Sequence, residues 1–445
     1  MWPRAFLFCF LFCATICALR EVEKRTNSPP TDDPFYVPPD GFEDAAPGTI
    51  LRHRPVPCTI VDLAHILNLD ASHQILYRTT DSFGNAIATV TTLLVPYNAD
   101  DSKLLSYQVA EDAAWMNCAP SYALQLPSIL GGLGGNIVPR AQLLLMEAAL
   151  QQGWLVNTPD FEGPDAAFLA NTLAGHAVLD GIRAVHASSD FTGIAPDPGT
   201  VMWGYSGGSL ATGFAAELQP SYAPDLRIAG AALGGTVPNI TGAVPLTNES
   251  PNTGLIPPGV LGLSHEYPEV RNALSDILVL EKREAFMQAE QQCLVANILQ
   301  FYGGNIFFYF ENPDFIFSFD SITNANSMGH HAPQIPLYIY KGTQDEVSAI
   351  GETNELVQYY CDGGSSVTYT KDLTATHLSM TILGAPGALI YLKDRLDGFD
   401  PGSGCSVDTV ISSLLNPATS AILTEALIKE LLSLLGKPVG PILIG

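Results

Sequence analysis

The chain is poor in basic residues: it has 20 Lys and Arg against 45 Asp and Glu, which gives a formal net charge of −25 at pH 7. So acidic a protein is repelled by nucleic acids and by anionic membrane surfaces, and neither is expected as a partner. Charged residues make up only 15% of the 445 residues, whereas hydrophobic residues make up 47%. The chain can therefore bury a large core, and its length leaves room for one main domain with a substantial insertion.

Long hydrophobic runs are also scarce. The apolar stretch 5–16 follows Arg4 and precedes the small residues Cys17-Ala18, and it is too short to span a bilayer. This pattern predicts a signal peptide over 1–18 and a secreted, extracellular protein. In the tail, acidic and basic residues interrupt the apolar segment 420–435, which favours an amphipathic helix over an anchor, so stable membrane insertion is not expected.

A short N-terminal arm is predicted over 19–39, ahead of the main domain. The dibasic pair Lys24-Arg25 is a candidate second processing site, which would make the arm up to residue 25 a propeptide. The Pro-rich stretch 27–39 is expected to be extended.

Cysteine is infrequent as well. Three of the eight cysteines fall in the predicted signal peptide, and the other five would enter an oxidising compartment: Cys58, Cys118, Cys293, Cys361 and Cys405. Two disulfides and one leftover thiol is the simplest arrangement. None of these cysteines has zinc-ligand spacing, so no metal site and no cofactor are expected. Asn239 and Asn248 begin glycosylation sequons, and the chain is predicted to be a glycoprotein.

What the chain does contain is a G-x-S-x-G motif, formed by Gly204, Tyr205, Ser206, Gly207 and Gly208. An apolar, strand-like run precedes it and a helix-like run follows it. This is the context of a nucleophile elbow, a sharp turn that exposes a serine between a strand and a helix. Glycines flank such a serine because side chains there would collide with neighbouring backbone.

An aspartate and a histidine follow in the order that the α/β-hydrolase fold requires, nucleophile then acid then base. Asp345 comes just after the strand-like segment 335–340, and His377 follows the alternating segment 366–370 in a predicted short loop. A serine needs a neighbouring imidazole to accept its proton and a carboxylate to orient that imidazole. Asp345 alone could be a turn residue, and any one of nine histidines could be structural. The order and context together predict a catalytic triad of Ser206, Asp345 and His377.

Six segments are predicted as strands, with helical patterns between them: 106–110, 154–158, 201–203, 227–233, 337–340 and 367–370. Before them, alternating segments on either side of 81–85 predict an antiparallel hairpin. This order predicts an α/β protein of the α/β-hydrolase fold, with a mostly parallel central sheet flanked by helices. The catalytic domain is expected to comprise 40–235 and 334–445.

The segment 236–333 is far longer than one crossover needs, so it is predicted to be a cap or lid with elements of its own. Its first part, 259–297, has helical periodicity. The segment 301–310 that follows is strongly aromatic, and three further phenylalanines stand at Phe315, Phe317 and Phe319. These side chains could form an apolar wall for a long acyl chain, or they could simply bury the cap on the main domain.

Several further motifs are spread along the chain, at 107–113 with 117–122, 150–154, 160–163, 179–183, 204–208, 221–226, 376–378 and 436–442. Together they resemble the fungal secretory lipase family, over nearly the whole mature chain. The resemblance implies a secreted triacylglycerol lipase, a carboxylic ester hydrolase that forms an acyl-enzyme on Ser206. Its substrate would be an acylglycerol or another ester at a lipid–water interface, and the chain would be a monomer.

The resemblance also implies an oxyanion hole made by the side chain of Asp112 and the backbone N–H of Gly207. Asp112 could help only if it is protonated, because an ionised carboxylate would repel the developing oxyanion. The implied disulfides are Cys118 with Cys293 and Cys361 with Cys405, which leaves Cys58 over. A C-terminal flap after residue 404, or the cap, could gate the site. An esterase, transacylase or peptidase on the same scaffold remains an alternative, as does a non-catalytic binding protein.

Overall fold

The computed structural model describes residues 28–63, 65–97, 99–130 and 136–413. The predicted signal peptide, the Lys24-Arg25 pair, the amphipathic tail helix and the motif at 436–442 lie outside these residues. In the described part of the chain, no helix is both long enough and apolar enough to cross a membrane.

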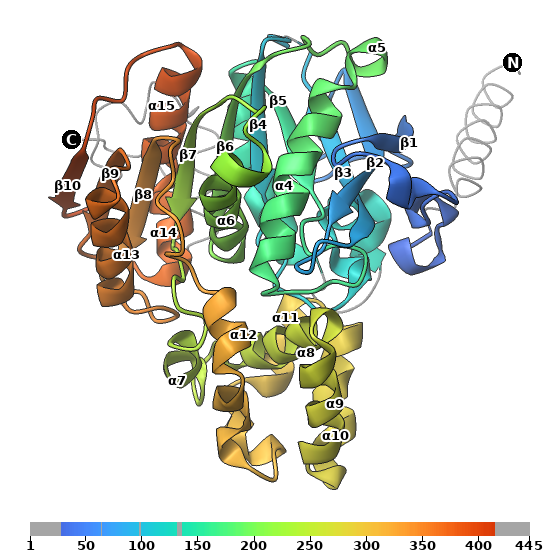
Figure 1. Cartoon of the computed structure of the whole chain (residues 1–445), viewed down its shortest axis with the longest axis vertical. Helices are drawn as coiled ribbons and strands as arrows, with labels where there is room; N and C mark the ends of the chain where they lie inside the picture. The colour runs from blue at the N-terminus through green and yellow to red at the C-terminus, as the bar shows by residue number, and fades with distance from the viewer. Residues whose placement is uncertain (1–27, 64, 98, 131–135, 414–445) are drawn as a thin grey trace, which may run out of the picture.

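A ten-stranded sheet runs through the molecule in the order β1-β2-β3-β5-β4-β6-β7-β8-β9-β10 (Figure 1). From β5 to β10 neighbouring strands are parallel, whereas β1, β2, β3 and β5 pair antiparallel. The strands are β1 Ile50–Pro55, β2 Ala71–Thr80, β3 Ala86–Val95, β4 Lys103–Gln108, β5 Leu155–Pro159, β6 Gly199–Tyr205, β7 Ile228–Gly234, β8 Leu337–Gly342, β9 Val367–Asp372 and β10 Cys405–Val410. The six predicted strands and the hairpin are therefore present, and the sequence did not predict β1 and β10.

Helices cover both faces of this sheet (Figure 1). One face packs against α3 (Ile137–Gln151) and α15 (Ala385–Leu396), around Tyr107, Trp203 and Tyr340. The other face packs against three helices, α4 (Asn171–His186), α6 (Gly207–Tyr222) and α13 (Ile350–Asp362). The central strands are buried on both sides, which is why they are nearly continuous apolar runs in the sequence. The shorter helices of this part are α2 Pro120–Ala123, α5 Ser189–Thr192 and α14 His377–Leu383.

The chain between β7 and β8 forms a separate layer of helices beyond one end of the sheet, which we call the insertion (Figure 1). Its helices are α7 Ala243–Thr247, α8 Ile256–Glu266, α9 Pro268–Ile277, α10 Arg283–Met287, α11 Leu294–Phe301 and α12 Asp320–Ala325. The aromatic segment after α11 forms 3-10 turns, including η9 Ile306–Tyr309 and η10 Pro313–Ser318. The insertion has its own apolar core, in which Phe286, Phe301 and Phe310 are buried.

Both ends of the insertion are tied to the sheet layer by buried charged side chains. At its start, the Lys341 Nζ donates to the carbonyl oxygen of Thr236 at 2.7 Å. At its end, the carboxylate of Glu217 accepts from the backbone N–H groups of Gly329, His330 and His331 at 2.8, 2.9 and 2.9 Å. The two points where the insertion leaves and rejoins the sheet layer are therefore fixed.

The prediction of an extended arm before residue 40 was wrong for the described part. Pro30–Asp32 and Pro34–Tyr36 form 3-10 turns, because proline at the first position presets the backbone for them. Phe35 and Tyr36 are buried against the β2–β3 hairpin, and the Tyr36 hydroxyl lies 2.7 Å from Ser121 Oγ. Two apolar rings thus hold the arm on the sheet.

Candidate active site

Ser206 stands at a sharp turn between β6 and α6. Its backbone has φ 54° and ψ −122°, a conformation that a residue with a Cβ adopts at an energetic cost. The Ser206 N–H donates to the carbonyl oxygen of Gly234 at 2.9 Å, which fixes the turn on the neighbouring strand. The hydroxyl is thereby held out of the sheet edge, as a nucleophile elbow requires.

Two glycines make this turn possible by close approach. A Cβ on Gly204 would stand 2.0 Å from the carbonyl oxygen of Gly208, and a Cβ on Gly208 would stand 2.0 Å from the carbonyl oxygen of Gln108. Real Cβ atoms do not approach backbone oxygens so closely, so neither position accepts a side chain without moving the strand or the helix. The spacing of the motif therefore reflects packing around the serine.

The three residues predicted as a triad meet at one point. Ser206 Oγ lies 2.8 Å from His377 Nε2, and His377 Nδ1 lies 2.8 Å from Asp345 Oδ2. Asp345 is fully buried, whereas the His377 side chain is 12% exposed, so the histidine lies at the boundary with solvent. A hydroxyl, an imidazole and a carboxylate linked in this order can transfer a proton from the hydroxyl to the imidazole.

His377 is the first residue of α14 rather than part of the loop that the sequence predicted. Its backbone is held on both sides: the N–H donates to Glu346 Oε2 at 2.9 Å, and the carbonyl accepts from the hydroxyl of Tyr205. The preceding Thr376 caps the helix with its side chain. Sequence reasoning missed Glu346 and the Tyr205 hydroxyl as supports of the histidine, although both lie next to motif residues.

Asp345 is fixed by four partners, two backbone N–H groups and two side-chain nitrogens. Its Oδ1 accepts from the N–H groups of Val347 and Ser348, at 2.9 and 3.0 Å, and its Oδ2 faces both His377 and Lys341. Burial alone would raise the pKa of Asp345, but His377, Lys341 and the Ser348 N–H together lower it far below its usual value. Asp345 is therefore an ionised acceptor for the histidine.

Asp112 lies directly against the start of α6. A Cβ on Gly207 would stand 1.9 Å from Asp112 Oδ1, so the carboxyl occupies the space beside the residue after Ser206. Asp112 has φ 50°, and its carboxyl is buried. Burial raises the pKa of Asp112 to about 7, against the opposing effect of His377. Gly207 is the first residue of α6, where an N–H has no partner within the helix and is free to meet a ligand.

Asp112 belongs to a buried group of four carboxyls, with Glu111, Asp160 and Glu162. Burial raises the pKa of Asp160 to about 7, although Ser121 donates to it from its hydroxyl and its N–H. Burial and the neighbouring carboxyls raise the pKa of Glu111 and of Glu162 well above the usual range. Four carboxyls in one buried place favour bound protons, and so Asp112 lies where a neutral carboxyl is favoured.

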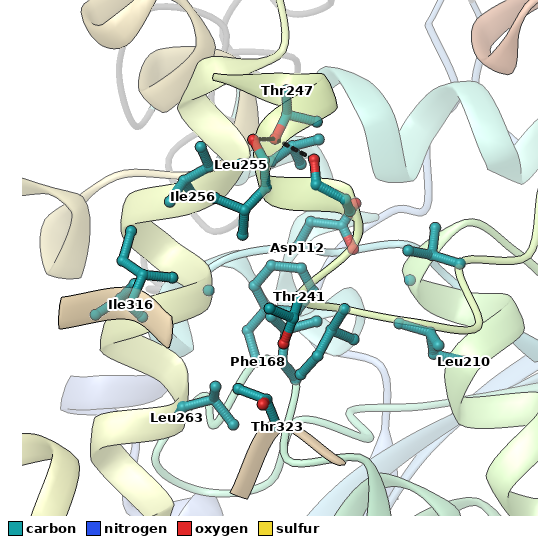
Figure 2. A pocket seen from close by; sticks show the side chains of 18 of the residues that line it. Asp112, Phe168, Leu210, Thr241, Thr247, Leu255, Ile256, Leu263, Ile316 and Thr323 are labelled. Atoms are coloured by element: carbon teal, nitrogen blue, oxygen red, sulfur yellow. Dashed lines mark hydrogen bonds between the residues drawn. The ribbon is translucent and has the colours of Figure 1, made fainter. Parts of the chain in front are cut away.

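A cavity of about 110 Å³, partly open to solvent, is lined by Ser206, Gly207 and Asp112 among others. Figure 2 shows the side chains around it, which come from the sheet layer and from the insertion. Apolar residues dominate the lining: Phe168, Leu169, Leu210, Val237, Ile240, Val244, Leu255, Ile256, Val260, Leu263, Val270, Phe315, Ile316, Phe319 and Val347. Phe315 and Phe319 line the cavity, whereas Phe301 and Phe310 are buried in a core of the insertion itself rather than against the main domain.

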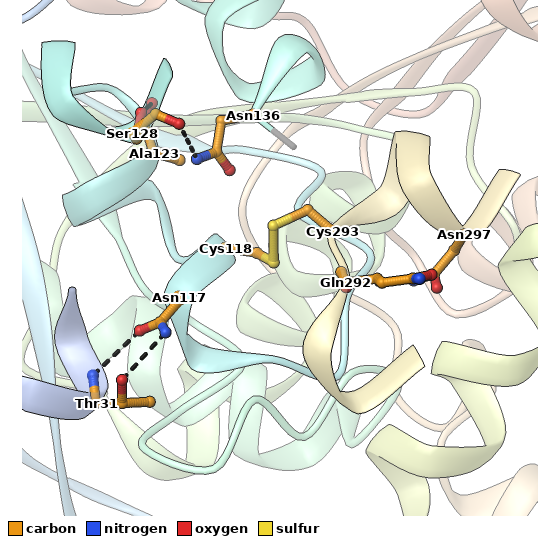
Figure 3. The surroundings of a disulfide bond; sticks show 9 residues. All are labelled: Thr31, Asn117, Cys118, Ala123, Ser128, Asn136, Gln292, Cys293 and Asn297. Carbon is orange, nitrogen blue, oxygen red and sulfur yellow. Dashed lines mark hydrogen bonds between the residues drawn. A yellow bond between two sulfur atoms is a disulfide. The ribbon is translucent and has the colours of Figure 1, made fainter. Parts of the chain in front are cut away.

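Two disulfides are present, Cys118–Cys293 and Cys361–Cys405, the pairings that the family resemblance implied. Figure 3 shows the first of them joining the sheet layer to the start of α11 in the insertion. Next to it, Asn117 pairs with Thr31 through two hydrogen bonds of 3.1 Å, so the arm, the sheet layer and the insertion meet here. Cys58 takes part in neither disulfide.

The two sequon asparagines both lie in the insertion. Asn239 is exposed, and its side-chain oxygen accepts from the N–H of Gly242 at 3.0 Å. Asn248 is half-buried, and its side-chain oxygen accepts from the N–H of Ile306 at 2.8 Å. Within the described ranges, no three His, Cys, Asp or Glu side chains form a group that could hold a metal ion.

The protein has the α/β-hydrolase fold, which it shares with solved structures of lipases and esterases. Candida antarctica lipase A in its closed state superposes with a TM-score of 0.81 at 30% identity, covering 93% of this chain and 99% of that chain. The rice cell wall degrading esterase LipA from Xanthomonas oryzae, at 14% identity, has a TM-score of 0.62 and shares the fold. The predicted fold class is confirmed.

Sequence comparison narrows the class to one family. Residues 129–404 match the family model described as Secretory lipase. Lipase A of Arthroderma benhamiae is 48% identical over 93% of this chain and 89% of its own length, and Lipase 5 of Candida albicans is 41% identical over 87% and 85%. The chain belongs to the secretory lipase family. It is accordingly a triacylglycerol lipase, a carboxylic ester hydrolase, as the motifs predicted.

Proposed function

We propose that Ser206, His377 and Asp345 hydrolyse the ester through an acyl-enzyme. His377 Nε2 accepts the Ser206 proton while Oγ attacks the ester carbonyl carbon, and Asp345 stabilises the imidazolium that results. The tetrahedral intermediate collapses as His377 returns the proton to the leaving alcohol, which departs. Water then attacks the acyl-enzyme by the same route, and the carboxylic acid leaves. The observation that supports this most directly is the unbroken chain of two 2.8 Å contacts from Oγ to the carboxylate.

Asp112 and Gly207 act as the oxyanion hole in this proposal. The Gly207 N–H and a protonated Asp112 carboxyl would each donate a hydrogen bond to the oxygen that becomes negative. The pKa of Asp112, raised to about 7, supports this role, since the acid is protonated below that pH and can donate there. The close approach of Asp112 Oδ1 to the residue after Ser206 also supports this role.

The substrate proposed is an acylglycerol at a lipid–water interface. The apolar lining of the cavity next to Ser206 suits an acyl chain better than a polar or peptide substrate. Residues 236–333 act as the cap that covers the acyl chain of the substrate. Residues 40–235 and 334–445 form the catalytic domain. The protein acts as an exported monomer with a signal peptide at 1–18, and glycans on Asn239 and Asn248 would lie on the cap.

The experiment that tests the nucleophile is labelling with a fluorophosphonate followed by peptide mapping. We expect the label on the peptide that contains Ser206, and none on Ser206→Ala. Hydrolysis of a p-nitrophenyl ester should fall at least about 10⁴-fold in Ser206→Ala and in His377→Ala, while the fold is retained. A Ser206→Ala enzyme with wild-type turnover would refute the assignment.

Rates on emulsified triolein, short soluble esters and peptides test the substrate class. Turnover of triolein above that of the short esters is expected. Preference for short esters would make the chain an esterase, and cleavage of peptides would make it a peptidase on the same scaffold.

A further inference from the structure

Lys341 is a lysine without solvent contact. It lies on β8, whose six residues are all buried, and its side chain is 0% exposed. Its Nζ donates to the carbonyl oxygen of Thr236 at 2.7 Å and lies 3.2 Å from Asp345 Oδ2. Both neighbours are acceptors, as an ammonium requires. A buried ammonium is costly unless a carboxylate offsets its charge, and here that carboxylate is the proposed catalytic acid.

The lysine and the histidine bind the same carboxylate atom. Asp345 Oδ2 lies 3.2 Å from Lys341 Nζ and 2.8 Å from His377 Nδ1, so two nitrogens contact the same oxygen. Asp345 Oδ1 is occupied by two backbone N–H groups. The carboxylate therefore cannot rotate towards one partner without losing another, and its orientation towards His377 is set from behind by Lys341.

Other charged or titratable groups face this pair from the neighbouring elements. Burial lowers the pKa of Lys341, and the charges of Asp345 and, to a smaller extent, of Glu352 on α13 oppose this lowering. Glu346 accepts from the N–H of His377. Burial and the negative charge of Asp345 raise the pKa of Tyr205 on β6 and of Tyr369 on β9, so both phenols remain neutral. Around the acid, Lys341 thus supplies positive charge among acidic and neutral groups.

Resting on the triad proposed above, we propose that Lys341 is a positioning residue for the catalytic acid. Its ammonium holds the Asp345 carboxylate on His377, and its positive charge disfavours a second positive charge on the imidazole. The acid limb of the pH–rate profile is therefore expected at lower pH than it would be with Asp345 alone. At such separations in a protein, one unit charge shifts a titration by about one pH unit.

The test is the pH dependence of kcat/KM on a soluble ester in four variants. Lys341→Met and Lys341→Gln remove the charge, and the glutamine keeps a donor should the methionine variant fail to fold. Both are expected to move the acid limb of the profile to higher pH by about one unit. Lys341→Arg, which keeps the charge, should return the acid limb towards the wild-type position. Lys371→Met is the matched control, because Lys371 is the register partner of Lys341 on β9.

The outcomes separate this inference from the triad itself. Lower kcat in both neutral variants with an acid limb at the wild-type pH would overturn it, since a purely structural lysine changes the rate without moving the limb. A shift of equal size in Lys371→Met would also overturn it. Fluorophosphonate labelling of the wild type is run alongside: failure to label Ser206 refutes the proposed function, whereas labelling with an unmoved acid limb refutes only the role of Lys341.

Discussion

The Oδ1 atom of Asp112 fills the space beside Gly207 that any larger residue would need, since a Cβ on Gly207 would lie 1.9 Å from it. The two residues are 95 positions apart in the chain, yet one must be glycine for the other to approach. The Asp112 carboxyl therefore lies beside the residue that follows Ser206. The first two predictions concern this pair of residues.

Gly207→Ala should displace the Asp112 carboxyl and lower kcat on a p-nitrophenyl ester about 100-fold or more, the usual loss when an oxyanion donor is removed. Gly351→Ala on α13 is the matched control, because a Cβ there meets nothing within 4 Å. Its activity should equal that of the wild type. Near-normal kcat in Gly207→Ala would show that the Asp112 position does not matter to the reaction.

Asp112→Asn should change the alkaline side of the pH–rate profile. Burial raises the pKa of Asp112 to about 7, so the protonated donor is present below that pH and is lost as pH rises through it. The amide of asparagine donates at every pH, and the fall in kcat above about pH 7 should disappear. Asp112→Ala should lose about 100-fold below about pH 7, where the wild-type acid is protonated, and progressively less at higher pH. An unchanged alkaline limb in Asp112→Asn would contradict the donor role.

The four buried carboxyls should make the fold more stable in mild acid than in mild base. Their pKa values are raised on folding, so the folded chain binds protons that the unfolded chain releases, and stability falls as pH rises from about 4 towards the folded values. Glu162→Gln should raise the melting temperature at pH 8 by a few degrees and change it little at pH 5. Calorimetry at both pH values measures this, with Glu269→Gln on exposed α9 as the control. A lower melting temperature of Glu162→Gln than of the wild type at pH 8 would contradict the predicted direction of the effect.

Removing the Cys118–Cys293 disulfide should destabilise the protein more than removing Cys361–Cys405. The two bonds join residues 175 and 44 positions apart, and the longer loop gains more entropy in the unfolded chain when it is opened. The expected difference in the free energy of unfolding is about 1 kcal/mol, measured by urea titration of the two double Cys→Ala variants. Equal losses would point to strain or residual structure instead of loop entropy.

The sequence predicted the central strands and the meeting of Ser206, Asp345 and His377 because each depends on local patterns. An apolar run followed by a catalytic type of residue, such as serine, aspartate or histidine, can be recognised in the sequence as the end of a parallel strand. The arm before residue 40 and the edge strand β10 were not readable in this way. Their structure depends on distant partners, such as the hairpin beneath Phe35 and the pairing of β10 with β9.

Lys341 shows the same limit within the site. Four residues before Asp345, a lysine in a strand is expected to face water, because lysine is seldom fully buried. Only the fold shows that it turns inward to the acid and to the carbonyl of Thr236. The aromatic segment was ambiguous for a similar reason, since a cavity wall and a core require the same apolar residues.

Lys341 and Glu217 hold the two ends of the insertion through hydrogen bonds to main-chain atoms. These atoms are the carbonyl oxygen of Thr236 and the N–H groups of 329–331. These main-chain groups are present whatever amino acids the insertion contains. A helical layer taken from a relative that keeps the cysteine partner of Cys118 could thus be exchanged between these two attachment points, and the cavity next to Ser206 would be altered while Ser206, His377 and Asp345 stay in place.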